Sequence, residues 1–218
     1  QTLAIIGATG CGKTTLISLI ARFYDATKGE VLVDGVNVKD YTFDGLYNKI
    51  GYITQKAVLF AGSIRENITF GESQDGFDEE TVDMAISLSQ AKEFVDKTEG
   101  GKEHRIVQLG KNVSGGQKQR LSIARALARK PEILIFDDSF SALDYKTDAA
   151  LRTAIERELS GTTTFIVAQR VSSVMSCEQI AVIDEGRIVA LGSHEELLAA
   201  CDIYREISES QLGGAILE

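Results

Sequence analysis

Apolar positions follow two different spacings along this chain, and one of them is typical of buried strands. The clearest example is the run from Ile133 to Phe136, which is continuously apolar and ends in Asp137. Such runs are typical of strands buried on both faces of a parallel sheet. Other short β-rich runs are bounded by turn residues, among them a pair on either side of Gly186. The predicted strands are residues 2–6, 133–137, 163–167, 180–183 and 187–190.

The second spacing is helical. Between residues 79 and 90, Val82, Ala85 and Ile86 recur at intervals near 3.6. Helices are predicted at residues 15–20, 79–90, 117–129 and 147–159. The pattern therefore predicts an α/β fold. We expect residues 1–55 and 130–218 to form its core and residues 56–129 to form a helical subdomain inserted into that core.

A phosphate-binding loop lies between the first predicted strand and the first predicted helix. Its sequence is Gly7-Ala8-Thr9-Gly10-Cys11-Gly12-Lys13-Thr14, followed by Thr15, and it matches G-x-x-x-x-G-K-[ST]. Glycines let the backbone turn tightly and direct N–H groups at phosphates, and the helix N-terminus adds its positive dipole end. Lys13 is predicted to reach the β- and γ-phosphates, and Thr14 to place its hydroxyl on Mg²⁺. A chance strand-to-helix turn is disfavoured because both flanks of the motif have the required context.

Asp137 is the predicted metal-side partner of this loop. It ends the buried strand at residues 133–137, and ligands of open α/β sheets collect at the carboxyl ends of the strands. A buried strand that ends in Asp is common by itself, but together with the phosphate loop it indicates a contact to Mg²⁺, through water.

A second anion-binding element precedes the predicted helix at residues 117–129. Ser114, Gly115, Gly116 and Gln117 can present a hydroxyl and free N–H groups at a helix N-terminus. The alternative is a simple helix cap followed by a flexible pair of glycines.

With these motifs in order, the chain resembles the nucleotide-binding domain of an ABC transporter over nearly its whole length. Residues 51–55 (GYITQ) resemble the family's glutamine loop, residues 113–117 its signature with Val113 in place of Leu, and residues 141–144 its D-loop. Residues 59–68 and 192–197 resemble the exporter branch of the family.

The resemblance implies a P-loop NTPase (RecA-like) core, with the helical subdomain inserted between the glutamine loop and the Walker B strand that ends at Asp137. It further implies that two such domains enclose two ATP molecules, the signature of each closing on the γ-phosphate that its partner holds. Gln55 is then an expected Mg²⁺ and catalytic contact, and Asp144 an expected nucleotide contact.

Two positions depart from the family pattern. Where the family has a Glu that holds the attacking water, this chain has Asp138, and where the family has a switch His, it has Gln169. Asp is one methylene shorter, and a displacement of roughly an ångström can cost about a hundredfold in rate. Gln169 can donate a hydrogen bond but cannot carry positive charge toward the phosphate. We therefore expect a weakly hydrolytic site; the milder alternative is that Asp138 still works slowly.

Composition agrees with this interpretation. The 218 residues are 44% hydrophobic and carry a net charge of −9, which disfavours non-specific binding to nucleic acid. No apolar run reaches the roughly 18 to 20 residues of a membrane helix. The three cysteines lack metal-ligand spacing and suit a reducing compartment. Since the chain begins directly at the phosphate-loop strand, we expect the family's preceding strands, its adenine-stacking aromatic residue and the membrane domain to be absent from it.

The sequence is interpreted as the ATP-binding domain of a heterodimeric ABC exporter at the cytoplasmic face of the cell membrane. Its expected partners are a second, non-identical nucleotide-binding domain and the exporter's transmembrane domains, and its ligands are ATP and Mg²⁺. The first alternative is a soluble ABC ATPase of DNA repair or translation, although no coiled-coil insertion or tandem domain is present. The second is a P-loop small-molecule kinase, which leaves the signature and the D-loop unexplained.

Overall fold

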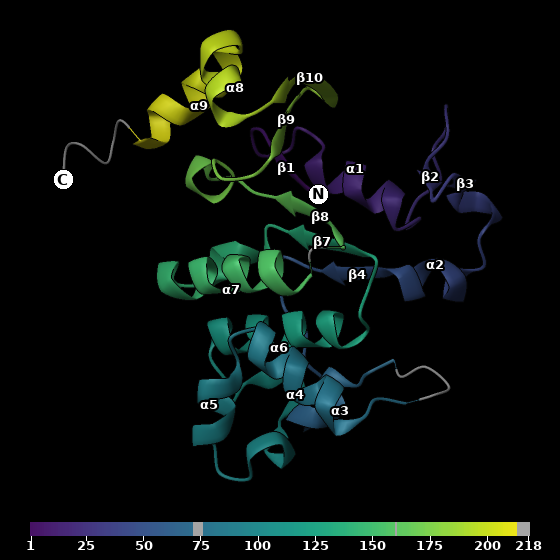
Figure 1. Ribbon diagram of the computed structural model, residues 1–218, viewed down its shortest axis with the longest axis vertical. Coiled ribbons are helices and arrows are strands. Elements are labelled where there is room, and N and C mark those ends of the chain that lie inside the picture. The colour runs from purple at the N-terminus through teal and green to yellow at the C-terminus, as the bar shows by residue number, and fades with distance from the viewer. Residues whose placement is uncertain (72–75, 160, 213–218) are drawn as a thin grey trace. The chain divides into compact units, whose positions relative to one another are not determined.

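The computed structural model describes residues 1–71, 76–159 and 161–212 (Figure 1). Contacts between residues divide the chain into two compact units. We call the first the sheet unit; it comprises Gln1–Tyr52, Ile133–Asp138 and the chain from Thr163 onward. The second, the helical unit, comprises Ile53–Glu132 and Ser139–Thr162.

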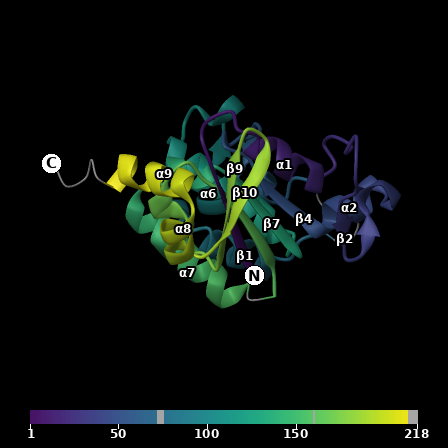
Figure 2. The ribbon, with the colours of Figure 1, turned by 90° about the horizontal axis from the view of Figure 1, so that it is seen from above.

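A six-stranded sheet organises the sheet unit, in the order β10-β9-β1-β8-β7-β4. Strand β1 runs parallel to both β8 and β9, and β7 runs parallel to β8. The edge strand β10 is antiparallel to β9, and Figure 2 shows the two side by side as a hairpin. The strands are β1 (Thr2–Ile6), β4 (Ile50–Ile53), β7 (Ile133–Asp137), β8 (Thr163–Val167), β9 (Gln179–Asp184) and β10 (Arg187–Gly192). The predicted α/β fold with a mostly parallel sheet is confirmed.

The register of this sheet aligns the carboxyl ends of its central strands. Val167 of β8 lies opposite Ile5 of β1 on one side and Asp137 of β7 on the other. Helix α1 (Lys13–Ile20) follows β1 and contacts β7 and β8. Ile17 of α1 and Ile135 of β7 are buried in the core cluster that lies between helix and sheet. The loop between β1 and α1 therefore lies at the edge of the sheet where Asp137 ends its strand.

The described part of the sheet unit also contains a small hairpin and the α-helices α2, α8 and α9. Strands β2 (Leu32–Val33) and β3 (Val36–Asn37) are antiparallel. Both turn residues between them, Asp34 and Gly35, have positive φ, as a two-residue hairpin turn with Asp-Gly requires. Helix α2 spans Phe43–Lys49 and is capped by Thr42. Helices α8 (His194–Ala200) and α9 (Asp202–Leu212), yellow in Figure 2, follow β10.

Helix α6 (Gly115–Ala128) is the central element of the helical unit. It contacts α3 (Ile64–Ile68) and α4 (Glu79–Leu88), and α4 also contacts α7 (Tyr145–Glu158). Helix α5 (Lys92–Lys97) and the antiparallel pair β5 (Gly62–Ser63) and β6 (Arg105–Ile106) also belong to it. The sequence boundaries had assigned residues 139–159, which include α7, to the core, whereas the contacts group α7 with the helical unit. Within the described ranges, no helix combines the length and the apolar character needed to cross a bilayer.

Candidate functional site

The loop between β1 and α1 depends on glycine at several positions. Gly10 and Gly12 have φ of 83° and 105°, in the region that side chains with a Cβ disfavour. A Cβ on Gly7 would lie 2.2 Å from the carbonyl oxygen of Ile183, so this position has no room for a side chain. Cys11 is buried, and its side chain belongs to the core cluster. Its side chain therefore contributes packing, and its backbone N–H and carbonyl are hydrogen-bonded within the protein.

Lys13 folds back over this loop. Its Nζ donates to the carbonyl oxygens of Gly7 and Ala8, each at 2.8 Å, and the residue is only 8% exposed. The first hydrogen bond inside α1 runs from the Leu16 N–H to the Gly12 C=O. The three N–H groups of residues 13–15 therefore precede the hydrogen bonds of the helix. Gly12, at the N-cap, has no side chain to accept from them. Three N–H groups, a helix dipole and an ammonium thus form an arrangement suited to an anion.

Thr14 and Asp137 are hydrogen-bonded to each other. The Thr14 hydroxyl donates to Oδ1 of Asp137 at 2.9 Å, and the Asp137 residue is 7% exposed. A hydroxyl and a carboxylate oxygen at this separation are hard oxygen donors that fit Mg²⁺, which takes one or two protein ligands and keeps phosphate and water oxygens. In the part of the chain that the structure describes, no cluster of three or more His, Cys, Asp and Glu side chains could hold a metal by itself. The donor set is therefore of the kind that shares a metal with a phosphate ligand.

Tyr52 also contacts Asp137, and the sequence analysis assigned it no role. Its hydroxyl donates to Oδ2 of Asp137 at 3.2 Å from the end of β4, the strand next to β7. Burial raises the pKa of Tyr52 well above its usual value, and the nearby carboxylate adds to the shift. Both oxygens of Asp137 therefore accept a hydroxyl. Tyr52 lies in the quoted GYITQ segment, but nothing in that segment marks its hydroxyl as a partner of Asp137.

Asp138 and Gln169 are brought into contact. The Nε2 of Gln169 donates to Oδ2 of Asp138 at 2.7 Å. Asp138 is 9% exposed, has φ of 49°, and donates its N–H to the carbonyl of Val167 at 2.9 Å. The backbone of Asp138 is thus fixed against β8, and its carboxylate is held by the side chain of the segment that follows β8. The two departures from the family pattern lie in one hydrogen-bonded pair.

The signature residues begin α6 in the helical unit. The Ser114 Oγ accepts from the Gln117 N–H at 3.2 Å, and the Gln117 Oε1 accepts from the Ser114 N–H at 2.8 Å, which is a capping box. The glycines between them leave space: a Cβ on Gly115 would meet nothing within 4 Å, and one on Gly116 would lie 3.5 Å from the carbonyl oxygen of Ala142. Ser114 is therefore a helix cap in this conformation, at an exposed helix end with room for a ligand.

The glutamine loop and the D-loop residues also belong to the helical unit. Gln55 is exposed, and its neighbour Thr54 accepts at its carbonyl from the buried Gln119 of α6 at 3.2 Å. Asp144 caps α7, accepting from the N–H of Thr147 at 3.0 Å and from its hydroxyl at 2.7 Å. These hydrogen bonds lower the pKa of Asp144. The residues expected to contact nucleotide thus form one set in the sheet unit and another in the helical unit.

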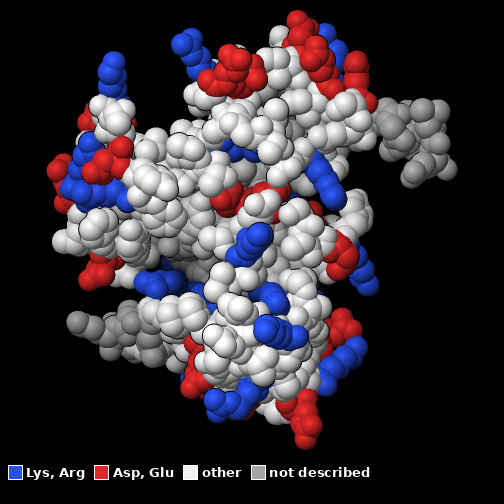
Figure 3. Space-filling model, turned by 180° about the vertical axis from the view of Figure 1, so that it is seen from behind, with Lys and Arg blue, Asp and Glu red and all other residues white. Residues whose placement is uncertain are grey.

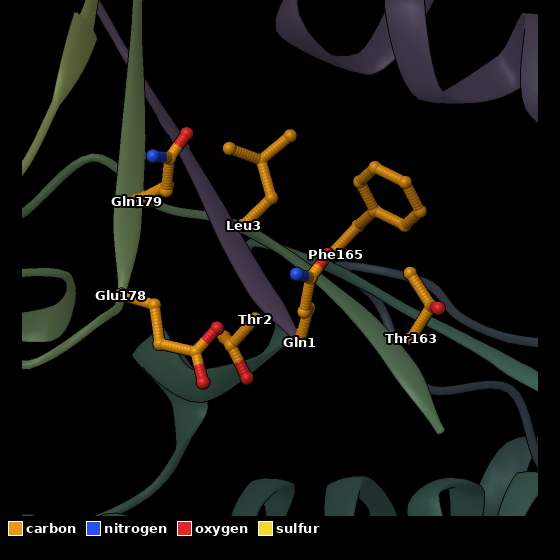
Figure 4. Close-up of a pocket in the computed structure, with 7 residues that line it drawn as sticks. All are labelled: Gln1, Thr2, Leu3, Thr163, Phe165, Glu178 and Gln179. Carbon is orange, nitrogen blue, oxygen red and sulfur yellow. The ribbon is translucent and has the colours of Figure 1, made fainter. Parts of the chain in front are cut away.

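A pocket with a volume of about 490 Å³ lies at a different edge of the sheet (Figure 4). It is lined by the amino-terminal ends of β1 and β8, through Leu3, Thr163 and Phe165, and by Gln179 at the start of β9. These three strands are parallel, so this edge is opposite to the one at which Asp137 ends β7. Because ligands of parallel sheets bind at the carboxyl edge, this pocket is separate from the candidate site.

Comparisons with known proteins agree with the motifs. The sequence model described as ABC transporter matches residues 1–141. An uncharacterized ABC transporter ATP-binding protein of Mycobacterium tuberculosis is 44% identical over 96% of this chain, which covers 36% of that protein. An ATP-dependent lipid A-core flippase of Mannheimia succiniciproducens is 39% identical over 98% of this chain and is likewise covered to 36%.

A solved structure of a bacterial Atm1-family ABC exporter with ATP bound is also similar. It superimposes with a TM-score of 0.89 at 35% identity, over 94% of this chain and 36% of the exporter chain. The chain therefore spans little more than a third of the length of each of these three relatives.

Proposed function

Because this chain belongs to the ABC transporter family and its relatives are ATP-binding proteins, we propose that it binds Mg-ATP through its sheet unit. We further propose that it uses this binding to power export across a membrane. The observation that carries the proposal is the paired arrangement of Lys13 over its glycine loop and of Thr14 on Asp137. It supports a phosphate site and a divalent-cation site side by side, which is what a nucleoside triphosphate with its metal requires.

The residues of the sheet unit have separate tasks in this proposal. The N–H groups of the loop and of the first turn of α1, within residues 7–15, bind phosphate oxygens, and the Lys13 ammonium exchanges its contacts to the Gly7 and Ala8 carbonyls for the β- and γ-phosphates. Thr14 and Asp137 hold Mg²⁺, with Gln55 as a further contact from the glutamine loop. When bound, the metal neutralises charge on the phosphate oxygens.

We infer that hydrolysis at this site is weak. Asp138 is the group that would hold the attacking water, and its carboxylate accepts a hydrogen bond from Gln169 at 2.7 Å. A glutamine in this place orients the carboxylate, but it supplies no positive charge to the developing phosphate charge. The side chain of Asp138 is also one methylene shorter than the Glu of the family pattern. Together these features support a site that keeps ATP bound longer than it would with Glu and His.

The helical unit would serve a second domain. Ser114, Gly115, Gly116 and Gln117, with Asp144 of the D-loop, form the grip that closes on the nucleotide of a partner domain. The proposed partner is a non-identical ATP-binding domain whose own site carries a working Glu and His. The transmembrane domains of an exporter are further partners, which places the chain at the cytoplasmic face of the membrane. As functional parts we propose residues 1–55 with 130–218 for the ATPase core and residues 56–129 for the signature subdomain, whereas the contact-based units group α7 with the helical unit.

The relatives favour the exporter over a soluble ABC ATPase of DNA repair or translation. One is named a lipid A-core flippase and the similar structure is titled an ABC exporter. Charge points the same way, since the net charge is −9 and Figure 3 shows basic side chains interspersed with acidic ones on the face it presents. Such a surface attracts a nucleic-acid backbone poorly.

Equilibrium binding of Mg-ATP and steady-state turnover test the proposal. Lys13→Ala should abolish measurable binding, because it removes the charge-assisted phosphate contact. Lys97→Ala is the matched control: its side chain is 72% exposed and, among the residues that the structure describes, forms an ion pair only with Glu93 on α5. The control should bind ATP as the parent chain does. Unchanged binding in Lys13→Ala would contradict the site assignment, and turnover of roughly 10 per second or more would contradict weak hydrolysis.

A further inference from the structure

The last turn of α9 is hydrogen-bonded to the switch segment at residues 169–171. The Nε2 of Gln211 donates to the carbonyl oxygen of Gln169 at 2.8 Å, and the Oε1 of Gln211 accepts from the N–H of Val171, also at 2.8 Å. One partner is an acceptor and the other a donor, so together they fix the orientation of the Gln211 amide. A single side chain thus brackets the backbone on both sides of Arg170.

This bracket is continuous with the candidate site. Gln169, whose carbonyl accepts from Gln211, donates through its own side chain to Oδ2 of Asp138 at 2.7 Å. Three hydrogen bonds therefore connect the C-terminal helix to the carboxylate that is proposed to hold the attacking water. All the residues involved belong to the sheet unit.

Helix α9 is itself held firmly enough to act as a support. Tyr204 in its first half is completely buried, and its hydroxyl lies 2.8 Å from Nδ1 of His194 on α8. Ser208, one turn later, is 4% exposed. Val171, at the other end of the bracket, is completely buried as well. Gln211, itself exposed, therefore connects the anchored helix α9 to the buried Val171.

We propose that Gln211 is a positioning residue for the nucleotide site. It holds the backbone of residues 169–171 so that the Gln169 side chain stays on Asp138. The inference rests on the proposed function for Asp138 and Gln169. It extends that function to α9, since any displacement of this helix would reach the carboxylate through the bracket.

The test uses Gln211→Ala in the 218-residue chain, with two readouts that need no nucleotide. Amide hydrogen exchange at Val171 should quicken by roughly two- to tenfold, the factor that one ordinary hydrogen bond supplies. In NMR spectra, the side-chain amide protons of Gln169, assigned by their loss in Gln169→Ala, should move toward the shifts of a free glutamine. Gln211→Glu keeps the acceptor for Val171 and loses the donor to Gln169, so it should retain more of the Val171 protection than Gln211→Ala.

A third readout is ATP turnover. Gln211→Ala should lower kcat by roughly two- to tenfold and leave the KM for ATP unchanged, because Gln211 does not touch the phosphate loop. In a Gln169→Ala background the same substitution should have no further effect on kcat, since it acts through Gln169. Glu209→Ala, a change at an exposed residue of the same helix that makes no hydrogen bond or ion pair to the described residues 169–171, is the control and should behave as the parent chain.

Unchanged Gln169 resonances in Gln211→Ala would overturn the inference, and so would an unchanged kcat once those resonances have moved. A chain that binds no ATP would instead overturn the proposed function. In that case the exchange and NMR readouts would still decide whether Gln211 holds Gln169 on Asp138.

Discussion

Asp138 shows at the scale of one residue how backbone and side chain combine to place a functional group. Its φ of 49° lies in the left-handed region, where Asp and Asn are tolerated better than most residues with a Cβ. The backbone hydrogen bond to Val167 and the side-chain hydrogen bond from Gln169 then fix both ends of the residue. The weak activity that we propose thus comes from side-chain length and charge, and the surrounding backbone already holds the position.

Asp138→Glu combined with Gln169→His should therefore raise turnover at this site. The longer carboxylate reaches further toward the water, and the imidazole can carry charge to the γ-phosphate. We expect a gain of roughly ten- to a thousandfold, with each single change giving less because both groups act on one transition state. The rate is measured with the partner's catalytic Glu replaced, so that its hydrolysis does not mask the gain. A double variant that binds ATP normally but stays as slow as its parent would place the defect elsewhere.

At the scale of elements, helix α6 holds the segment that follows the glutamine loop. The guanidinium of Arg125 on α6 donates to the carbonyl and side-chain oxygens of Asn67 at 2.7 and 3.0 Å, and to the carbonyl of Val58 at 3.0 Å. It also lies over the stacked rings of Phe60 and Phe70. Burial lowers the pKa of Arg125 to about 10, so the hydrogen bonds must compensate for the lost hydration of a cation.

Removing this guanidinium should destabilise the helical unit. Arg125→Ala removes the guanidinium donor from the carbonyl oxygens of Asn67 and Val58, while the Asn67 side-chain oxygen keeps the Phe60 N–H. It should lower the free energy of unfolding by about 2 to 4 kcal/mol in urea titrations. Arg125→Lys should restore only part of the loss, because an ammonium cannot donate in the geometry of a guanidinium fork. Arg157→Ala, at a side chain that is 75% exposed, is the control and should cost less than about 0.5 kcal/mol. Equal losses in Arg125→Ala and Arg157→Ala would show that the buried network contributes no stability.

At the scale of the whole molecule, each chain is proposed to supply two half-sites to two different nucleotides. The phosphate loop of the sheet unit holds one ATP, and the signature of the helical unit closes on the ATP of the partner. Because hydrolysis is slow, ATP-bound pairs of domains should accumulate, since each pair dissociates only after turnover. Because the signature is intact, such pairing can be measured with two copies of this chain.

Ser114→Asp should block this pairing without unfolding α6. Asp is as good an N-cap as Ser, so the helix keeps its cap, but the new carboxylate repels a γ-phosphate. We expect Mg-ATP to convert the parent chain from monomer to dimer in light-scattering measurements, and Ser114→Asp to stay monomeric. The matched control is Ser193→Asp, which changes the capping serine of α8 and lies outside the signature. Dimerisation of Ser114→Asp at the parent's ATP concentration would be evidence against the sandwich arrangement.

The sequence by itself determined the family, the fold class and most of the residues proposed for the site. It could do so because the phosphate loop, the strand that ends at Asp137 and the signature are local motifs, in which a few neighbouring residues specify both conformation and chemistry. Predicted helices at residues 79–90 and 147–159 agree to within two residues with α4 and α7 as observed. Periodicity specifies such elements well because each buries one face.

Only the tertiary structure revealed the contacts that join distant segments. Tyr52 and Asp137 are 85 residues apart in sequence, and Gln211 and Gln169 are 42 apart. The grouping of α7 with the helical unit also depends on contacts with α4 and not on its place in the chain. Such contacts depend on sheet register and helix packing, to which many weak interactions contribute at once. No local pattern marks the single tyrosine or glutamine that the finished fold places beside a functional carboxylate or a switch segment.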